Sequence, residues 1–238
     1  CPDQGAPPDR RALTAAADFR APSLDLLAGI DAQKAALREN SRRLAAGLPA
    51  HDLLLWGSRG MGKSTLVKAI VADLQRGGAD LALVEVGRDS LADLRTLFGR
   101  LRPLSRRFIL FADDMSFDAN AEEAKALRSL LEGGAEARPD NVRLYVTSNR
   151  RHLVPRNIAE QDSAINVRDV VDDRLALSDR FGLSLGFHNA DQATYLAMVA
   201  GYCRHFGLTF DEHEALAWSV ARGGRSGRVA WQYVQNRA

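Results

Sequence analysis

The sequence has few cysteines and no long apolar segment. Cys1 and Cys203 are its two cysteines, too few for a disulfide framework, and no Cys-x-x-Cys pair is present to bind zinc. No apolar run approaches the ~20 residues that a membrane-spanning helix needs, and no signal peptide opens the chain. These absences predict a cytoplasmic protein that has no membrane partner.

An excess of charge of one sign is also missing. Thirty-two Lys and Arg residues oppose thirty Asp and Glu residues in a chain of 238, which leaves a net charge of +2. This balance argues against a protein that binds nucleic acid or a membrane surface through its overall charge. The first residue is Cys1 instead of Met, so we expect a fragment of a longer chain, with a lipidated mature N-terminus as the alternative.

Three regions follow from the pattern along the chain. Residues 1–22 hold half of the eight prolines and predict an extended lead-in. Residues 23–187 alternate short apolar runs with amphipathic segments, which is typical of an α/β domain with helices on both faces of a parallel sheet. Residues 188–238 contain amphipathic segments alone, which predict a small helical lid domain.

The expected elements are short. The apolar runs predict strands at 53–56, 81–86, 108–111, 142–146 and 183–187. Helical spacing predicts helices at 31–46, 66–74, 91–101, 121–131, 212–221 and 228–235. A further helix through Phe206 is expected to start at Asn189, with Gln192 completing a capping box.

A glycine-rich segment between an expected strand and an expected helix matches G-x-x-x-x-G-K-[ST] in full. It consists of Gly57, Ser58, Arg59, Gly60, Met61, Gly62, Lys63 and Ser64, and we extend the site to Thr65. Glycines let backbone N–H groups wrap a phosphate, and the start of the helix adds its dipole to the same anion. Lys63 can reach the β and γ phosphates, and Ser64 can bind Mg²⁺. The alternative is a glycine-rich turn with a surface lysine.

Two acidic residues end another expected strand. Asp113 and Asp114 follow the run 108–112, at the carboxyl end of a sheet strand, where ligands of open α/β sheets bind. Asp113 is suited to hold Mg²⁺ together with Ser64, and Asp114 could orient or deprotonate an attacking water. A solvated turn at the strand end is the alternative.

Together these motifs resemble those of the AAA+ P-loop ATPases. The resemblance implies ATP and Mg²⁺ as cofactors and places Ile30 near the adenine, in a box that precedes the sheet. It implies a sensor role for Asn149 in the segment Thr147-Ser148-Asn149, whose alternative is a turn that ends the strand. It also implies a second sensor arginine at the start of the last helix, for which Arg228, inside the first turn of that helix, is a better candidate than Arg225. A solvated charge is the alternative for either arginine.

The segment Leu177-Ser178-Asp179-Arg180-Phe181-Gly182 resembles the part of AAA+ proteins that carries an arginine finger. In such proteins the arginine stabilises charge on phosphate bound by a neighbouring subunit, so the resemblance implies a homo-oligomer. The alternatives for Arg180 are a plain surface residue or an ion pair with Asp179.

A closer resemblance covers nearly the whole chain, from about Leu27 to Tyr233. The strings LLLWGSRGMGKSTLVKA, FILFADDMSF, TSNRRHLVP, LSDRFGL and GRSGRVAWQ are similar to those of a bacterial AAA+ family of unknown function. Many AAA+ members have Glu where this chain has Asp114, and the shorter side chain favours slow turnover. Replication initiators resemble this chain in having two aspartates there.

Three functions stay open on the sequence. The first is an ATPase that drives interaction with a protein or nucleic-acid client. The second is a regulatory switch or loader in which ATP or ADP sets partner affinity and hydrolysis is slow. The third is a small-molecule kinase, because phosphate loops also serve that class.

Overall fold

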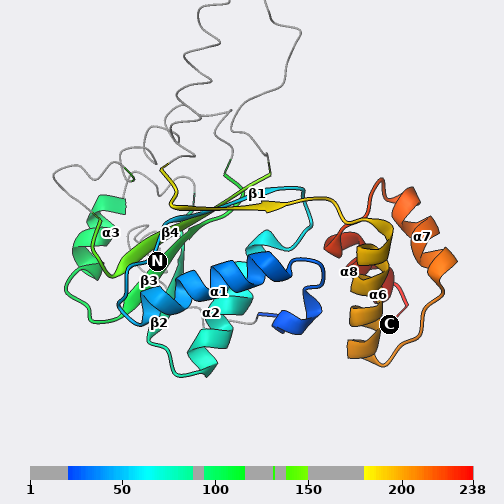
Figure 1. Cartoon of the computed structure of the whole chain (residues 1–238), viewed down its shortest axis with the longest axis horizontal. Helices are drawn as coiled ribbons and strands as arrows, with labels where there is room; N and C mark the ends of the chain where they lie inside the picture. The colour runs from blue at the N-terminus through cyan, green and yellow to red at the C-terminus, as the bar shows by residue number, and fades with distance from the viewer. Residues whose placement is uncertain (1–20, 88–93, 116–130, 132–137, 150–179, 238) are drawn as a thin grey trace, which may run out of the picture.

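The computed structural model describes residues 21–87, 94–115, 131, 138–149 and 180–237 (Figure 1). A five-stranded parallel sheet has the order β2-β3-β4-β1-β5. Its strands are β1 (Leu53–Gly57), β2 (Leu81–Glu85), β3 (Arg107–Ala112), β4 (Val142–Ser148) and β5 (Leu183–Phe187). The helices are η1 (Leu24–Leu26), α1 (Asp31–Ala45), α2 (Lys63–Arg76), α3 (Leu94–Leu101), α6 (Gln192–Phe206), α7 (Glu212–Ala221) and α8 (Gly227–Gln235).

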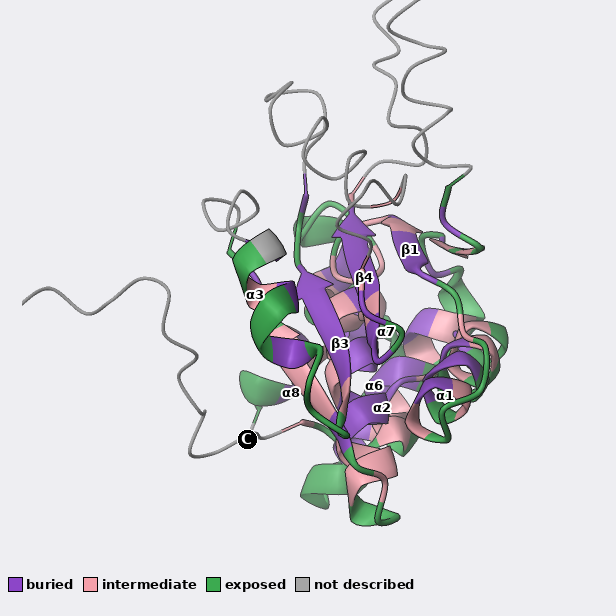
Figure 2. Ribbon diagram, turned by 90° about the vertical axis from the view of Figure 1, so that its left-hand side faces the viewer, coloured by how far each residue is buried: buried purple, intermediate pink, exposed green. Residues whose placement is uncertain are grey.

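The continuous apolar runs are explained by helices on both faces of the sheet. Successive strand residues point to opposite faces, so Leu53 and Leu55 pack in one buried cluster and Leu54 in another. The first cluster includes the apolar face of α1 and α2, and the second includes that of α3. Figure 2 shows β3 and β4 buried between these layers. The predicted α/β fold class is therefore confirmed.

Most predicted elements lie within a residue or two of the observed ones. The predicted start of α6 at Asn189 is wrong, because the helix begins at Gln192 with Asp191 as its N-cap. The Asp191 carboxylate accepts a hydrogen bond from the Thr194 N–H at 2.7 Å, which satisfies a free donor of the first turn and lowers the pKa of Asp191. The predicted helix 121–131 lies outside the described residues except at its last position.

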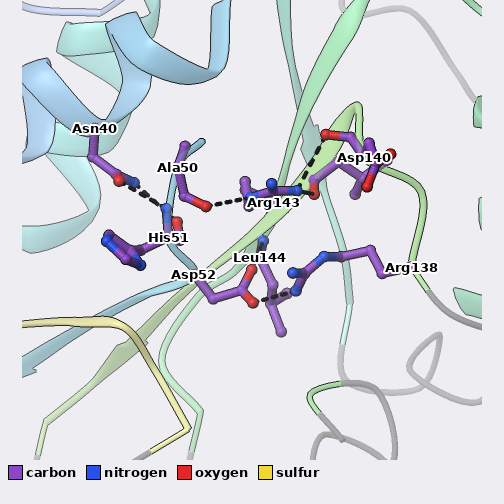
Figure 3. Close-up of polar contacts among 9 residues, drawn as sticks. Asn40, Ala50, His51, Asp52, Arg138, Asp140, Arg143 and Leu144 are labelled. Atoms are coloured by element: carbon purple, nitrogen blue, oxygen red, sulfur yellow. Dashed lines mark hydrogen bonds and ion pairs between the residues drawn. The ribbon is translucent and has the colours of Figure 1, made fainter. Parts of the chain in front are cut away.

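A polar cluster fastens the amino ends of β1 and β4 (Figure 3). The Asp52 carboxylate accepts a hydrogen bond from the Leu144 N–H at 2.7 Å and forms an ion pair with Arg138. Asn40 on α1 exchanges two hydrogen bonds, each of 2.9 Å, with the backbone of His51. These bonds fix α1, β1 and β4 relative to one another at the amino end of β1.

The helices α6, α7 and α8 form a separate group beyond the carboxyl end of β5 (Figure 1). Their apolar residues nevertheless join the same buried cluster as the sheet and η1. Met198 and Tyr202 on α6 are buried in this cluster with Ile30 and Met61. Within the described residues, none of the helices has the length and apolar character needed to cross a membrane.

Candidate functional site

The glycine-rich loop joins β1 to α2 and encloses the side chain of Lys63. Gly57, Gly60 and Gly62 have φ angles of 118°, 73° and 86°, which side chains other than hydrogen disfavour. Lys63 is the first residue of α2 and is 6% exposed. Its Nζ donates hydrogen bonds to the carbonyl oxygens of Gly57 at 2.8 Å and of Ser58 at 2.9 Å. The loop therefore holds an ammonium group at the start of a helix.

Burial lowers the pKa of Lys63 from 10.5 to about 8, because desolvation disfavours its charged form. The carboxylates of Asp114 and Asp113 oppose this shift, whereas the guanidinium groups of Arg59 and Arg228 add to it. Four charged side chains, from the loop, the end of β3 and α8, thus act on Lys63.

A hydroxyl and a carboxylate meet at the start of α2. Ser64 Oγ donates to Asp113 Oδ1 at 2.6 Å, which joins α2 to the end of β3. The buried hydroxyl of Thr147 on β4 donates to the same oxygen at 2.5 Å. Because β4 lies between β3 and β1 in the sheet, Thr147 reaches the acidic pair from the neighbouring strand end.

Asp114 is held in an unusual backbone conformation. Its φ angle is 52°, in the left-handed region that costs most residues roughly 1–2 kcal/mol but that Asp visits more readily. The Asp114 N–H donates to Thr147 Oγ1 at 2.8 Å, and the Asp114 carboxylate accepts a hydrogen bond from Asn149 Nδ2. Asn149 Oδ1 in turn accepts from Lys63 Nζ at 3.1 Å. A continuous series of hydrogen bonds thus links the loop, the end of β3 and the end of β4.

These groups line a cavity of about 820 Å³. Its lining includes charged and polar residues, namely Arg59, Lys63, Ser64, Asp113, Asp114, Thr147, Asn149 and Arg228. It also includes mostly apolar residues, namely Pro22, Leu26, Leu27, Ala28, Ile30, Met61, Met198, Tyr202 and Trp231. A ligand with an anionic part and a flat, weakly polar part matches this mixed lining.

The cavity brings together the predicted residues Arg59–Thr65, Asp113, Asp114, Asn149, Ile30 and Arg228. Gly57 and Ser58 contribute the carbonyl oxygens that bind Lys63. Arg225 and Arg180 are not among the described residues that line it. Arg180 is exposed and precedes β5, whose first residue pairs with the first residue of β1, so Arg180 lies at the amino end of the sheet, away from the loop. Residues 177–179 lie outside the described part of the chain.

Two parts of the site were not predicted from the sequence. The first is the role of Thr147, which lies in the predicted sensor segment beside Asn149 but whose contacts are recognisable only once β3 and β4 are paired. The second is the contribution of α6 and α8, where Tyr202 and Trp231 pack with ring centroids 5.1 Å apart beside the cavity. No sequence signal placed Trp231 at a cavity.

The helix α8 is also in direct contact with the glycine-rich loop. The Arg228 N–H donates to the Gly60 carbonyl oxygen at 3.0 Å. A Cβ atom on Gly60 would lie 2.9 Å from Ser226 Oγ and 3.0 Å from Arg228 Cβ, so glycine is required here for close packing as well as for its φ angle. Ser226 is the N-cap of α8 and accepts a hydrogen bond from the Val229 N–H.

The donor set fits a magnesium ion. Ser64 Oγ and Asp113 Oδ1 are hard oxygen donors on one wall of the cavity, and Mg²⁺ prefers such oxygens, with water and phosphate completing its shell. Among the described residues, no three His, Cys, Asp or Glu side chains gather in a cluster that could hold a transition metal.

Several solved structures are similar to the chain in fold. The Thermotoga maritima RuvB Holliday junction branch migration motor has 20% identity and a TM-score of 0.54, with 89% of this chain and 62% of that chain covered. The Aeropyrum pernix ORC1 protein, solved in complex with DNA, has 16% identity and a TM-score of 0.62, with 87% and 58% covered. Aeropyrum pernix ORC2, in ADPNP–ADP complexes, has 13% identity and a TM-score of 0.59, with 90% and 62% covered.

The chain thus spans less than two thirds of the length of these neighbours. Comparison with curated protein sequences found no match. A family model described as "Protein of unknown function (DUF815)" matches residues 6–238, which is nearly the whole sequence. The chain therefore belongs to the DUF815 family, and its fold is that of the AAA+ P-loop ATPases.

Proposed function

We propose that the chain binds ATP with Mg²⁺ in the 820 Å³ cavity and hydrolyses it to drive or switch an interaction with a macromolecular partner. A continuous chain of hydrogen bonds from Lys63 through Asn149, Asp114, Thr147 and Asp113 to Ser64 supports this proposal. It links one cationic side chain and two carboxylates that line the cavity. The nucleotide would lie between a core of residues 23–187 and a lid of residues 188–238.

In this proposal each residue has a defined task. Lys63 and the N–H groups of the loop bind the phosphates, assisted by Arg59 and Arg228. Ser64 and Asp113 hold Mg²⁺, which when bound would neutralise charge on the phosphates. Asp114 accepts a proton from the attacking water, and Asn149 orients the water and the carboxylate.

A slow regulatory switch is the alternative, and one observation favours it. The Asp114 side chain is one methylene shorter than that of Glu and so reaches less far toward a water, and Asn149 already occupies one acceptor site of its carboxylate. A long-lived ATP state would then set the affinity for a protein or nucleic-acid client. We place this activity in the cytoplasm.

The direct test is to measure phosphate release from ATP and the mass of the protein in solution, with and without ATP and Mg²⁺. Phosphate release without an added acceptor would support an ATPase and exclude a small-molecule kinase. Absence of ATP binding by the purified chain would overturn the proposal.

We predict that Arg180→Ala removes hydrolysis but leaves ATP binding intact. Arg180 lies at the amino end of the sheet, away from its own cavity, so it would act on a neighbouring subunit. An arginine finger accounts for about 1,000-fold or more in rate. The measurement is phosphate release as a function of protein concentration.

The dependence of hydrolysis on protein concentration distinguishes action of Arg180 on a neighbouring subunit from action within its own chain. Wild-type activity per molecule should rise with protein concentration, and mixing in a Lys63→Ala chain with an intact Arg180 should restore activity to Arg180→Ala subunits. Normal hydrolysis by Arg180→Ala at every concentration would exclude the finger.

We also predict that ATP binding takes up protons above pH 8. The pKa of Lys63 is about 8 without a ligand, so its ammonium group is mostly charged below pH 8 and mostly neutral above it. Phosphate favours the charged form and raises this pKa, so affinity should fall as the pH rises through 8 and 9. Calorimetry in buffers of different ionisation enthalpy measures the uptake.

A Lys63→Arg variant supplies the comparison, because arginine stays charged throughout this range. Any binding that it retains should show no such pH dependence. Proton uptake near zero at pH 8.5 for the wild-type protein would contradict the assignment of Lys63 to the phosphates.

A further inference from the structure

We infer that Thr147 is a positioning residue that sets the geometry of both acidic groups through one buried hydroxyl. This inference rests on the proposed function, because its readout is metal and nucleotide binding. Thr147 is 1% exposed and belongs to β4, whereas Asp113 and Asp114, which carry the two acidic groups, come directly after β3 in the chain. The resemblance to AAA+ proteins gives the sensor role in this segment to Asn149 and no role to Thr147.

The hydroxyl of Thr147 has one donor and two acceptor sites, and it is the donor of one hydrogen bond and the acceptor of another. It donates to Asp113 Oδ1 at 2.5 Å and accepts from the Asp114 N–H at 2.8 Å. The first bond points Asp113 Oδ1 toward Ser64, which donates to the same oxygen at 2.6 Å. Thr147 therefore aligns the two groups proposed to bind Mg²⁺.

The second bond acts on the backbone of Asp114. A φ angle of 52° persists only where the surroundings hold it, and here the Thr147 hydroxyl binds the Asp114 N–H while the Thr147 carbonyl accepts from the Met115 N–H at 2.8 Å. This conformation brings the Asp114 carboxylate to Asn149. Removal of the hydroxyl alone should therefore loosen the metal-binding pair and the water-activating carboxylate together.

The test compares Thr147→Val, which keeps the shape and loses the hydroxyl, with Thr147→Ser, which keeps the hydroxyl. Residues that orient metal ligands typically contribute 10–100-fold to metal affinity or activity. We expect Thr147→Val to weaken Mn²⁺ binding to the protein–ATP complex about 10-fold or more, as measured by electron paramagnetic resonance. ATP binding in EDTA should be unchanged, kcat should fall while KM for ATP is retained, and Thr147→Ser should behave like the wild type.

Ser219→Ala is the matched control. Ser219 is also 1% exposed, and its hydroxyl donates to the Leu216 carbonyl oxygen at 2.7 Å within α7, away from the cavity. Loss of this buried hydroxyl should lower the melting temperature without changing Mn²⁺ binding. If Thr147→Val does not fold, Thr147→Ala makes the same deletion with a smaller side chain.

The outcomes separate the inference from the proposed function. Wild-type affinity for Mn²⁺ in a folded Thr147→Val protein, or an equal loss in Thr147→Ser, would overturn the role of the hydroxyl and leave the ATPase proposal intact. A wild-type chain that binds no ATP, with or without metal, would overturn the proposed function and this inference with it.

Discussion

Lys63→Ala should weaken ATP binding strongly and abolish hydrolysis. The ammonium group is buried at the start of α2 among the carbonyl oxygens of the loop, where phosphate oxygens would become its partners. A hydrogen bond to a charged group contributes about 1.5–3 kcal/mol, so loss of two such bonds weakens binding roughly 100-fold or more. Calorimetric titration with ATP and Mg²⁺ measures this loss directly.

Lys68→Ala provides a control on the same helix. Lys68 is one third exposed and pairs with Glu85 on β2 outside the cavity, so its removal should leave ATP affinity unchanged. Equal affinity of the Lys63→Ala and wild-type proteins would show that the loop does not bind the phosphates. A loss of ATP affinity in both Lys63→Ala and Lys68→Ala would indicate an effect on α2 as a whole.

Asp114→Asn should stop hydrolysis while ATP binding is retained. Asparagine tolerates the left-handed backbone at this position as well as aspartate does, so the substitution removes the proton acceptor without forcing the chain to move. General bases contribute about 100-fold to 10,000-fold in rate. Single-turnover hydrolysis and calorimetry on the same protein separate the two effects.

Asp140→Asn is the corresponding control. Asp140 is an exposed residue before β4, at the end of that strand that is far from the cavity. Its substitution should change neither the rate of single-turnover hydrolysis nor the affinity for ATP. Undiminished single-turnover hydrolysis by Asp114→Asn would assign water activation to another group. A loss of ATP binding would instead assign Asp114 to the phosphates or the metal.

The fold was predictable because each local signal was strong. The run Leu53–Trp56 has the continuous apolar character of a strand buried on both faces, and the glycine-rich segment that follows it in the sequence leads into a helix, as observed. The start of α6 was mispredicted because Asn189 and Asp191 are both good N-cap residues. The hydrogen bond from Thr194 to Asp191 decides between them, and it is visible only in three dimensions.

The candidate site was predictable in its motifs and unpredictable in its contacts. Lys63, Ser64 and Asp113 occupy motif positions, and the structure brings them to one cavity. Thr147 and Trp231 line the same cavity, and no role there was predicted for them, because their place depends on strand order and on the packing of α8. Of the two arginines that the resemblance to AAA+ proteins suggested, Arg228 lines the cavity and Arg225 is not among the described residues that do.

The contact between Gly60 and Arg228 has a mechanical consequence. It joins the loop to α8 through main-chain atoms alone, so substitution of the Arg228 side chain would leave the connection in place. In the proposed ATP complex, any rotation of the peptide plane that follows Gly60 would also turn the Gly60 carbonyl, to which the first turn of α8 is hydrogen-bonded. A change in the loop would therefore reach α8 without passing through a side chain.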